Sequence, residues 1–152
     1  MGFLTGKTAI ITGGGRAVLS NGECGSIGYG IATAYAKEGA NLVVTGRNVQ
    51  KLTDAKEELE KKYGIKVLPV QADVSASADN EAIVQNVVKQ AIDTFGRIDV
   101  LINNAQASAS GVTIADHTTE QFDLAVYSGL YAAFYYMKAC YPYLKETKGS
   151  VV

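Results

Sequence analysis

Residues 8–40 read TAIITGGGRAVLSNGECGSIGYGIATAYAKEGA and decide the fold. An apolar run ends in Thr12 and three glycines, and after a loop Ser26-Ile27-Gly28 begins a segment with apolar residues at helical spacing. This order predicts a strand, a glycine-rich turn and a helix. Glycines permit a tight turn and the close approach of a phosphate, and the first N–H groups of a helix attract an anion. The stretch therefore predicts a dinucleotide pyrophosphate site at the end of a parallel strand.

Composition excludes several classes of partner. The 152 residues include 14 Lys+Arg and 15 Asp+Glu, and a domain that binds nucleic acid needs a basic face, so we expect no nucleic-acid partner. No apolar run reaches the length of a membrane span and the N-terminus lacks a signal-peptide pattern, so we expect a cytoplasmic protein with no membrane partner. Cys24 and Cys140 form no CxxC pair and are expected to be reduced thiols. The single histidine, His117, offers no metal site.

Strands and helices alternate along the whole chain. Predicted strands cover about 7–12, 41–45, 66–70, 97–102 and the segment from residue 149, and predicted helices cover about 26–38, 49–63, 80–95 and 119–144. This alternation predicts one α/β domain over residues 1–152, built on a doubly wound parallel sheet. In the usual strand order 3-2-1-4-5 the third strand lies at an edge, where Pro69 and its missing N–H are tolerated. The fifth strand has only begun where the sequence stops.

The carboxyl ends of these strands carry glycine and polar residues. Ligands of such sheets bind beyond the ends of strands 1 and 4, where the direction of winding changes. The residues expected at the strand ends are Thr12–Gly15, Arg47, Asp73-Val74 and Asn103–Gln106. Polar residues at four separate strand ends favour a dinucleotide site more strongly than the glycine-rich turn alone.

Several segments resemble the short-chain dehydrogenases/reductases over nearly the whole chain. They are TG…SIGYGIA…AKEGA, VVTGRN, ADVS and GRIDVLINNAQ. More narrowly, LINNAQASASG and YSGLYAAFYYMKACYPYLKETKGSV resemble the NADP-dependent 12α-hydroxysteroid dehydrogenases that act on bile acids. The resemblance implies a Rossmann-like fold and an NADP(H)-dependent oxidoreductase that interconverts a secondary alcohol and a ketone. The implied substrate is a hydroxysteroid.

The resemblance also implies cofactor-binding roles. The residues that would line the pyrophosphate are Gly13, Gly14, Ser26, Ile27 and Gly28. Asp73 would hydrogen-bond the adenine amino group, and Val74 would pack against the adenine ring. Asn104 and Ala105 would lie along the adenosine ribose and the part of the cofactor next to the fourth strand.

Arg47 indicates which nicotinamide cofactor is bound. An acidic residue soon after the second strand would accept a hydrogen bond from a free ribose 2′-OH and repel a phosphate. This chain has Gly46 and Arg47 there, and a guanidinium can pair with a 2′-phosphate. NADP(H) is therefore favoured over NAD(H). Taken singly, Arg47 could also be an exposed loop charge and Asp73 a helix cap.

The glycine-rich loop departs from the family pattern TGxxxGxG. Fifteen residues lie between Thr12 and Gly28, nine more than in that pattern. Either the chain makes an excursion through Arg16–Cys24 or the turn is built differently. SIGYGIA is also similar to enoyl-acyl-carrier-protein reductases, so enoyl reduction is an alternative reaction. Two further departures are Gln106, where NNAG is commoner, and Gly129, where an asparagine that supports a proton-relay water is usual.

The residues that perform the chemistry in the family are expected outside this sequence. The family uses a serine after the fifth strand and a Tyr-x-x-x-Lys pair on the next helix, and the sequence stops at Val152. Ser128, Tyr141 and Lys145 match that pattern in spacing, but they fall in one predicted helix together with Pro142. We therefore expect no catalytic residue in 1–152 and no turnover by this segment alone. A non-catalytic NADP-binding module is the remaining alternative.

Tyrosines recur every four residues in the predicted helix 119–144. Tyr127, Tyr131 and Tyr135 form one stripe of this helix, which we expect to pack on the sheet or on a partner subunit. The resemblance implies a homo-oligomer, a homotetramer, that pairs its subunits through this helix.

Overall fold

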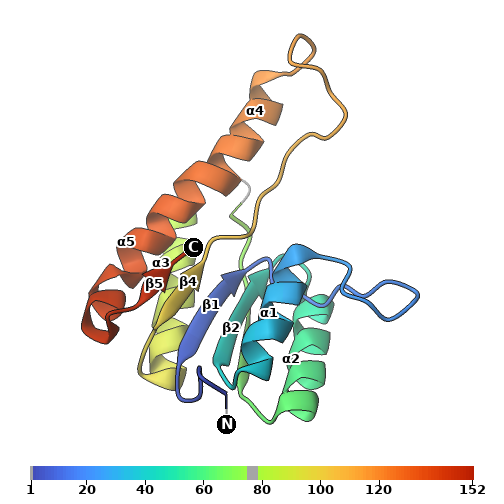
Figure 1. Ribbon diagram of the computed structural model, residues 1–152. Helices are drawn as coiled ribbons and strands as arrows, with labels where there is room; N and C mark the ends of the chain where they lie inside the picture. The colour runs from blue at the N-terminus through green and yellow to red at the C-terminus, as the bar shows by residue number, and fades with distance from the viewer. Residues whose placement is uncertain (1, 75–78) are drawn as a thin grey trace.

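The computed structural model describes residues 2–74 and 79–152. Within them, a parallel sheet in the order β3-β2-β1-β4-β5 forms the middle layer (Figure 1). The strands are β1 (Thr8–Thr12), β2 (Asn41–Gly46), β3 (Val67–Gln71), β4 (Val100–Ile102) and β5 (Ser150–Val151). The helices are α1 (Ile27–Lys37), α2 (Val49–Tyr63), α3 (Asn80–Phe95), α4 (Thr119–Ala125) and α5 (Ala132–Thr147), and the π-helix η1 (Val126–Tyr131) joins the last two. The predicted doubly wound sheet and its strand order are confirmed.

Both faces of the sheet are buried, as the continuous apolar strands require. Ile10 of β1 points to one face, toward α3 and α5, and its neighbour Ile11 points to the other, toward α1 and α2. Neither isoleucine has any exposed surface. Tyr29 of α1 and Tyr136 of α5 are the largest fully buried side chains, one in each core layer. None of the helices formed by the described residues is long and apolar enough to cross a membrane.

Helix ends follow the local signals in the sequence. Asn48 caps α2 by accepting a hydrogen bond from the Lys51 N–H at 3.0 Å. Gly64 ends the same helix with a φ of 69°, a conformation that glycine adopts without strain. Thr118 and Gln121 form the expected capping box at the start of α4.

The helical arm α4-η1-α5 shows which of its faces carries the tyrosine stripe. The arm continues to Thr147 rather than ending at 144, and the sheet-facing residues are Ser128, Ala132, Tyr136, Cys140 and Leu144. Tyr127 and Tyr131 are 36% and 43% exposed and stack on each other with ring centroids 5.2 Å apart. Of the two surroundings expected for the stripe, these two residues do not contact the sheet, and packing on a partner subunit stays a prediction. The neighbouring helix face packs into the core instead, with Ala132, Tyr136, Cys140 and Leu144.

A charged cluster joins β1 and β4 at the amino end of the sheet. The Asp99 side chain is 5% exposed, accepts a hydrogen bond from the Thr8 N–H at 2.9 Å, and pairs with Arg97 at 2.6 Å and Lys7 at 3.3 Å. Burial alone would raise the pKa of the Asp99 carboxyl, but the hydrogen bonds from Arg97, Thr8 and Lys7 outweigh burial and lower it. A buried carboxylate held in this way stabilises the fold only while it is ionised.

Replacing Asp99 with asparagine should therefore destabilise the protein at neutral pH. We expect D99N to lower the free energy of unfolding by about 2 kcal/mol at pH 7, because hydrogen bonds to a charged group are lost. The native pKa lies below the unfolded value of about 3.9, so the stabilisation is full above that pH and is lost as pH falls through the native pKa. Urea denaturation at pH 7 and below pH 4 measures both effects.

Asp93 provides the matched control. It pairs with Lys89 on the surface of α3, and both side chains are more than half exposed. D93N should change the free energy of unfolding by less than about 0.5 kcal/mol. Equal losses in the two variants would contradict a special role for Asp99.

Candidate functional site

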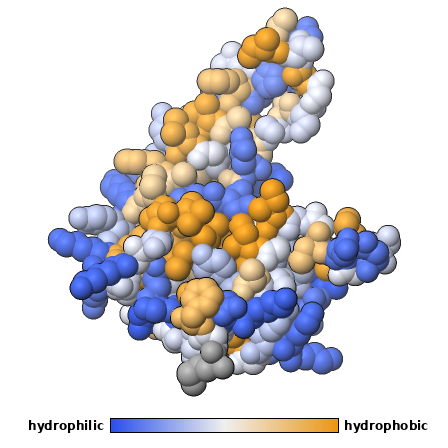
Figure 2. Space-filling view, viewed as in Figure 1, coloured by the Kyte–Doolittle hydropathy of each residue, from blue (hydrophilic) through white to orange (hydrophobic). Residues whose placement is uncertain are grey.

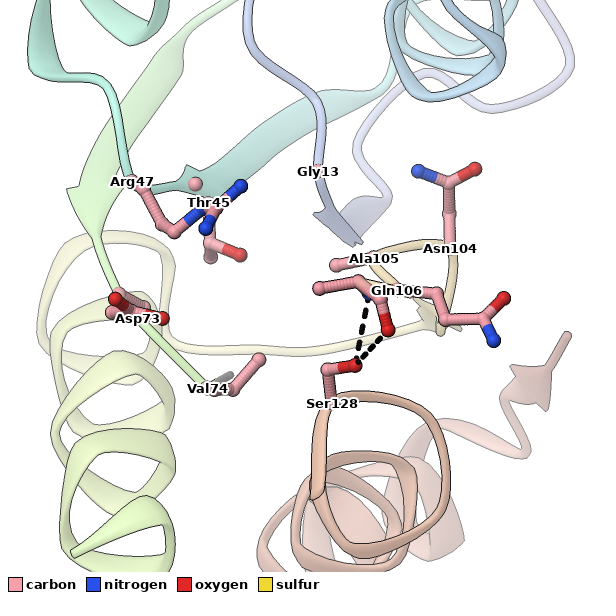
Figure 3. Close-up of a pocket in the computed structure, with 12 residues that line it drawn as sticks. Gly13, Thr45, Arg47, Asp73, Val74, Asn104, Ala105, Gln106 and Ser128 are labelled. Carbon is pink, nitrogen blue, oxygen red and sulfur yellow. Dashed lines mark hydrogen bonds between the residues drawn. The ribbon is translucent and has the colours of Figure 1, made fainter. Parts of the chain in front are cut away.

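A cleft of about 250 Å³ opens at the carboxyl ends of the strands. The predicted site residues that line it are Gly13, Arg47, Asp73, Val74, Asn104 and Ala105. Thr45, Gln106 and Ser128 also line it. Figure 3 shows Arg47 and Asp73 on one side of the cleft, facing Gly13 and Ala105 on the other. The sheet thus brings together predicted site residues that are up to 92 positions apart in the sequence, Gly13 and Ala105.

The Thr12 hydroxyl connects the end of β1 to the segment after β4, which lines the cleft. Its oxygen accepts hydrogen bonds from the backbone N–H groups of Asn104 at 2.9 Å and Ala105 at 2.8 Å, and it donates to the Ile102 carbonyl at 3.2 Å. In return, the Asn104 side-chain amide donates to the Thr12 carbonyl at 2.8 Å. These bonds join the ends of β1 and β4. Sequence reasoning placed Thr12 at the strand end without giving it this role.

Two glycines allow helix α1 to approach the turn after β1. Gly13 has a φ of 71°, and its N–H donates to the Thr45 carbonyl at 2.8 Å. A Cβ atom on Gly28 would lie 2.1 Å from the Gly13 carbonyl oxygen, a distance that no side chain can tolerate. Gly14 is buried beneath the turn, where a Cβ would lie 3.0 Å from Val44. The turn and the first turn of the helix therefore touch through backbone atoms alone.

The amino end of α1 presents N–H groups toward this region. The Ser26 hydroxyl caps the helix by accepting from the Tyr29 N–H at 3.4 Å, and the Ser26 carbonyl accepts from Gly30 at 3.1 Å. The N–H groups of Ile27 and Gly28 have no intrahelical acceptor, as at any helix start. The Ile27 side chain is 77% exposed and has no hydrogen-bond donor. Only the backbone N–H of this residue is therefore suited to bind an anion.

The additional residues in the glycine-rich loop form a small hairpin. Val18 pairs with Cys24 as an antiparallel bridge, and the Gly25 N–H donates to the Ala17 carbonyl at 2.7 Å. The hairpin projects from the body of the molecule in blue in Figure 1. Of the two alternatives left open by the sequence, the excursion is therefore the one observed. Arg16 anchors it by pairing with Glu58 of α2, which lowers the pKa of that carboxyl.

A second cleft of about 290 Å³ adjoins the first between the end of β4 and the helical arm. The Ser128 hydroxyl accepts from the Ala107 N–H at 2.9 Å and so ties the loop after β4 to η1. The Gln106 side chain lies beside Gly129, where a Cβ would be 3.7 Å from Gln106 Cγ. Burial raises the pKa of the Tyr136 hydroxyl in this cleft to about 12, so Tyr136 keeps its proton at neutral pH.

The serine, tyrosine and lysine that match the family pattern by spacing do not form a site. Ser128 is buried against the loop after β4, whereas Tyr141 is 62% exposed. Thirteen residues of helix separate them, which corresponds to about 20 Å along the axis. They cannot act on one substrate atom, in agreement with the interpretation of residues 119–144 as one helical segment.

The sequence is similar to a protein family and to individual members of it. The family model for short chain dehydrogenases matches residues 7–152. The chain belongs to the short-chain dehydrogenase family. It is 65% identical over its whole length to a 12alpha-hydroxysteroid dehydrogenase of Clostridium sp., and it covers 56% of that protein. It is 35% identical to the uncharacterized oxidoreductase YhxC of Bacillus subtilis, covering 47% of it. The chain therefore spans about half the length of these relatives.

Two solved structures that share this fold contain a bound nucleotide. An alcohol dehydrogenase from Thermococcus sibiricus complexed with 5-hydroxy-NADP gives a TM-score of 0.82 at 28% identity, over 95% of this chain and 56% of its own. L-Sorbose reductase from Gluconobacter frateurii, complexed with NADPH and L-sorbose, gives 0.82 at 31% identity, over 99% and 52%. The short-chain dehydrogenase fold of this chain is thus the one that holds NADP-type nucleotides in those proteins.

The contact between Gly28 and Gly13 gives a test of this short-chain dehydrogenase turn. We expect G28A to lower the free energy of unfolding by about 3 kcal/mol, because the new methyl group must push α1 away from the turn. G30A, two residues further along α1, is the control, since a Cβ on Gly30 would meet only Cys24 at 3.9 Å. Alanine is the better helix former, so G30A should gain about 0.5–1 kcal/mol. Thermal and urea denaturation of both variants would contradict this account if G28A were as stable as G30A.

Proposed function

We propose that residues 1–152 are the NADP(H)-binding domain of an oxidoreductase that interconverts a secondary alcohol and a ketone. The observation that carries this proposal is the position of Arg47, which faces the glycine turn across the strand-end cleft. In the part of the chain that the structure describes, no ion pair occupies the Arg47 guanidinium. A cation without a carboxylate partner beside a turn that excludes side chains is suited to bind phosphate groups.

The residues present fit the shape and charge of NADP(H). The amino end of α1 would hold the pyrophosphate with its first N–H groups, and Gly13, which lines the cleft, would lie beside it. Arg47 would pair with the adenosine 2′-phosphate. Gly14, Ser26 and Ile27 would support the pyrophosphate through the turn and the helix start.

The remaining predicted residues complete the proposed nucleotide site. Asp73 would accept a hydrogen bond from the adenine amino group, and Val74 would pack against the ring. Asn104 and Ala105, both fixed by the Thr12 hydroxyl, would lie along the ribose and direct the nicotinamide end toward Ser128. When bound, the nicotinamide cofactor would donate a hydride to the ketone or accept one from the alcohol. We assign no catalytic residue within 1–152, so this segment alone should bind the nucleotide without turnover.

A hydroxysteroid is the proposed substrate, and the 12alpha-hydroxysteroid dehydrogenase that is 65% identical to the chain supports this proposal. Enoyl reduction, suggested by SIGYGIA, and nucleotide binding without catalysis are the alternatives. We further propose a cytoplasmic location, which the two free cysteines, exposed Cys24 and buried Cys140, support.

Calorimetry with NADPH and NADH tests the proposed cofactor. We expect the wild-type protein to bind NADPH more tightly than NADH. R47A should weaken NADPH binding about 10- to 100-fold, the effect of losing a charge-assisted hydrogen bond. NADH, which lacks the 2′-phosphate, should bind R47A within about twofold of the wild type, because no other contact changes. An equal loss for both nucleotides would contradict the assignment of Arg47.

The reaction is tested on the intact gene product. With NADP⁺ and a 12α-hydroxysteroid, we expect the ketone and NADPH to form. The absorbance of the reduced nicotinamide measures the rate. Reduction of an enoyl thioester in place of steroid oxidation would support the enoyl reductase alternative. NADPH binding without turnover of any alcohol, ketone or enoyl substrate would support the non-catalytic module.

We also propose that the protein forms a homo-oligomer through the helical arm. Figure 2 shows a band of apolar and weakly apolar atoms along the part of the molecule where Figure 1 places α4. Large exposed side chains on this arm include Leu130, Tyr131 and Phe134, which are 68%, 43% and 52% exposed. Exposed apolar side chains that gather on one part of a surface are typical of protein–protein interfaces.

Sedimentation velocity tests the homo-oligomer. The wild-type protein should sediment as an oligomer, and Y131E should shift it toward the monomer, because the contact would bury an unpaired carboxylate. F3E is the control, since Phe3 is 80% exposed near the opposite end of the molecule. A monomeric wild-type protein would contradict the proposal.

A further inference from the structure

A cleft of about 270 Å³ continues from the strand-end cleft past Gly13, Gly46 and Arg47. It lies between the glycine turn and the start of α2, and its further lining includes Ser26, Asn48 and Lys51. Of the described residues that line it, Arg47 and Lys51 are cations and none is acidic. The charge of this cleft is therefore complementary to an anion.

The backbone of Lys51 is held against the glycine turn from two sides. Its N–H donates to Asn48 Oδ1 at 3.0 Å, and its carbonyl accepts from the Arg16 N–H at 2.7 Å. A Cβ on Gly15 would lie 3.2 Å from Lys51 Cβ, so the turn packs closely on the start of this side chain. The exposed remainder of the side chain begins at the wall of the cleft. Its attachment point is thus fixed relative to Arg47.

A lysine at this helical position is unfavourable for α2 itself. Lys51 is the third residue after the cap Asn48, where the positive end of the helix dipole disfavours a cation. A capping box has Glu or Gln at this position, as Gln121 shows in α4 of the same chain. The first turn of α2 contains no acidic residue. Departures from local preference of this kind are expected at functional sites.

The neighbouring cation Arg16 is already neutralised. It pairs with Glu58, so it adds no unpaired charge beside the cleft. Lys51, in contrast, forms no ion pair within residues 2–74 and 79–152. Arg47 and Lys51 are therefore the two charges that remain available to a ligand in this cleft.

We propose that Lys51 is a second determinant of specificity for the 2′-phosphate of NADP(H), acting together with Arg47. The inference rests on the proposed function, because it assigns this cleft to the adenosine end of the same nucleotide. A phosphate monoester carries nearly two negative charges at neutral pH. Arg47 would supply a planar fork of donors and Lys51 a compact ammonium from the other side. Two cations match the charge of the phosphate better than one.

Calorimetry on Lys51 variants with NADPH and NADH tests the proposal. We expect K51Q to weaken NADPH binding about five- to tenfold, a smaller loss than the removal of a fully buried charge would cause. The affinity for NADH should stay within about twofold of the wild type. K51R should retain most of the NADPH affinity, because it keeps the charge. K61Q is the matched control, since Lys61 is an exposed lysine of the same helix, ten positions or about 15 Å away from Lys51. It should leave both affinities unchanged.

A stability measurement separates a binding role from a structural one. K51E should raise the melting temperature of the nucleotide-free protein by about 2 °C, because an acid suits the helix start, while it weakens NADPH binding more than K51Q does. If Lys51 served packing or stability instead, K51E would lower the melting temperature and the NADPH affinity together. Opposite signs in the two measurements would support the proposal.

The outcomes for Lys51 and for the proposed function are distinguishable. If K51Q weakens NADPH and NADH equally, or leaves NADPH unchanged while R47A discriminates between them, the inference is wrong and the proposed function stands. If the wild-type protein binds neither nucleotide, the proposed function itself fails, and the inference fails with it.

Discussion

The hydrogen bonds of the Thr12 hydroxyl are the constraint on which the site depends. This side chain is 3% exposed and lies at the point where the sheet changes its direction of winding. Its oxygen accepts two backbone N–H groups from the segment after β4 and donates to a third backbone group in β4. Because one atom satisfies three backbone groups, the ends of β1 and β4 keep one separation, and the glycine turn and Asn104 keep one orientation. The side of the strand-end cleft that Gly13, Asn104 and Ala105 form takes its position from these bonds.

Alternation and helix capping could be read from the sequence because each depends on residues close together in the chain. The apolar runs, Asn48, Gly64 and the Thr118–Gln121 box act within one helical turn or one strand, and the structure follows them. The strand order was predictable because parallel crossover connections allow few topologies. Residues at the strand ends were predictable as a set, since the carboxyl ends of parallel strands share one edge.

Interactions between distant residues were not predictable in the same way. The tyrosine stripe was expected to face the sheet or a partner, but which helix face turns inward depends on how Ala132, Tyr136 and Cys140 pack in a core formed with distant strands and α3. The hairpin conformation of residues 16–25 depends on Lys51 and Glu58 of α2, which no local pattern connects to the loop. Asp99 appeared only as part of an apolar strand, because its partners Lys7 and Thr8 lie at the other end of the sequence.

The two edges of the sheet differ in how their charges are treated, and the difference indicates a ligand. At the amino edge, the buried carboxylate of Asp99 pairs with both Lys7 and Arg97, so each charge of that cluster has an opposite partner within the protein. At the carboxyl edge, Arg47 and Lys51 face a cleft whose described lining contains no acid, and α1 directs its first N–H groups toward the same side. A fold that pairs its charges at one edge and leaves like charges together at the other gains no stability from the second arrangement. The arrangement is explained when an anion with two or more charged groups completes it, and a dinucleotide with a 2′-phosphate has that pattern of charge.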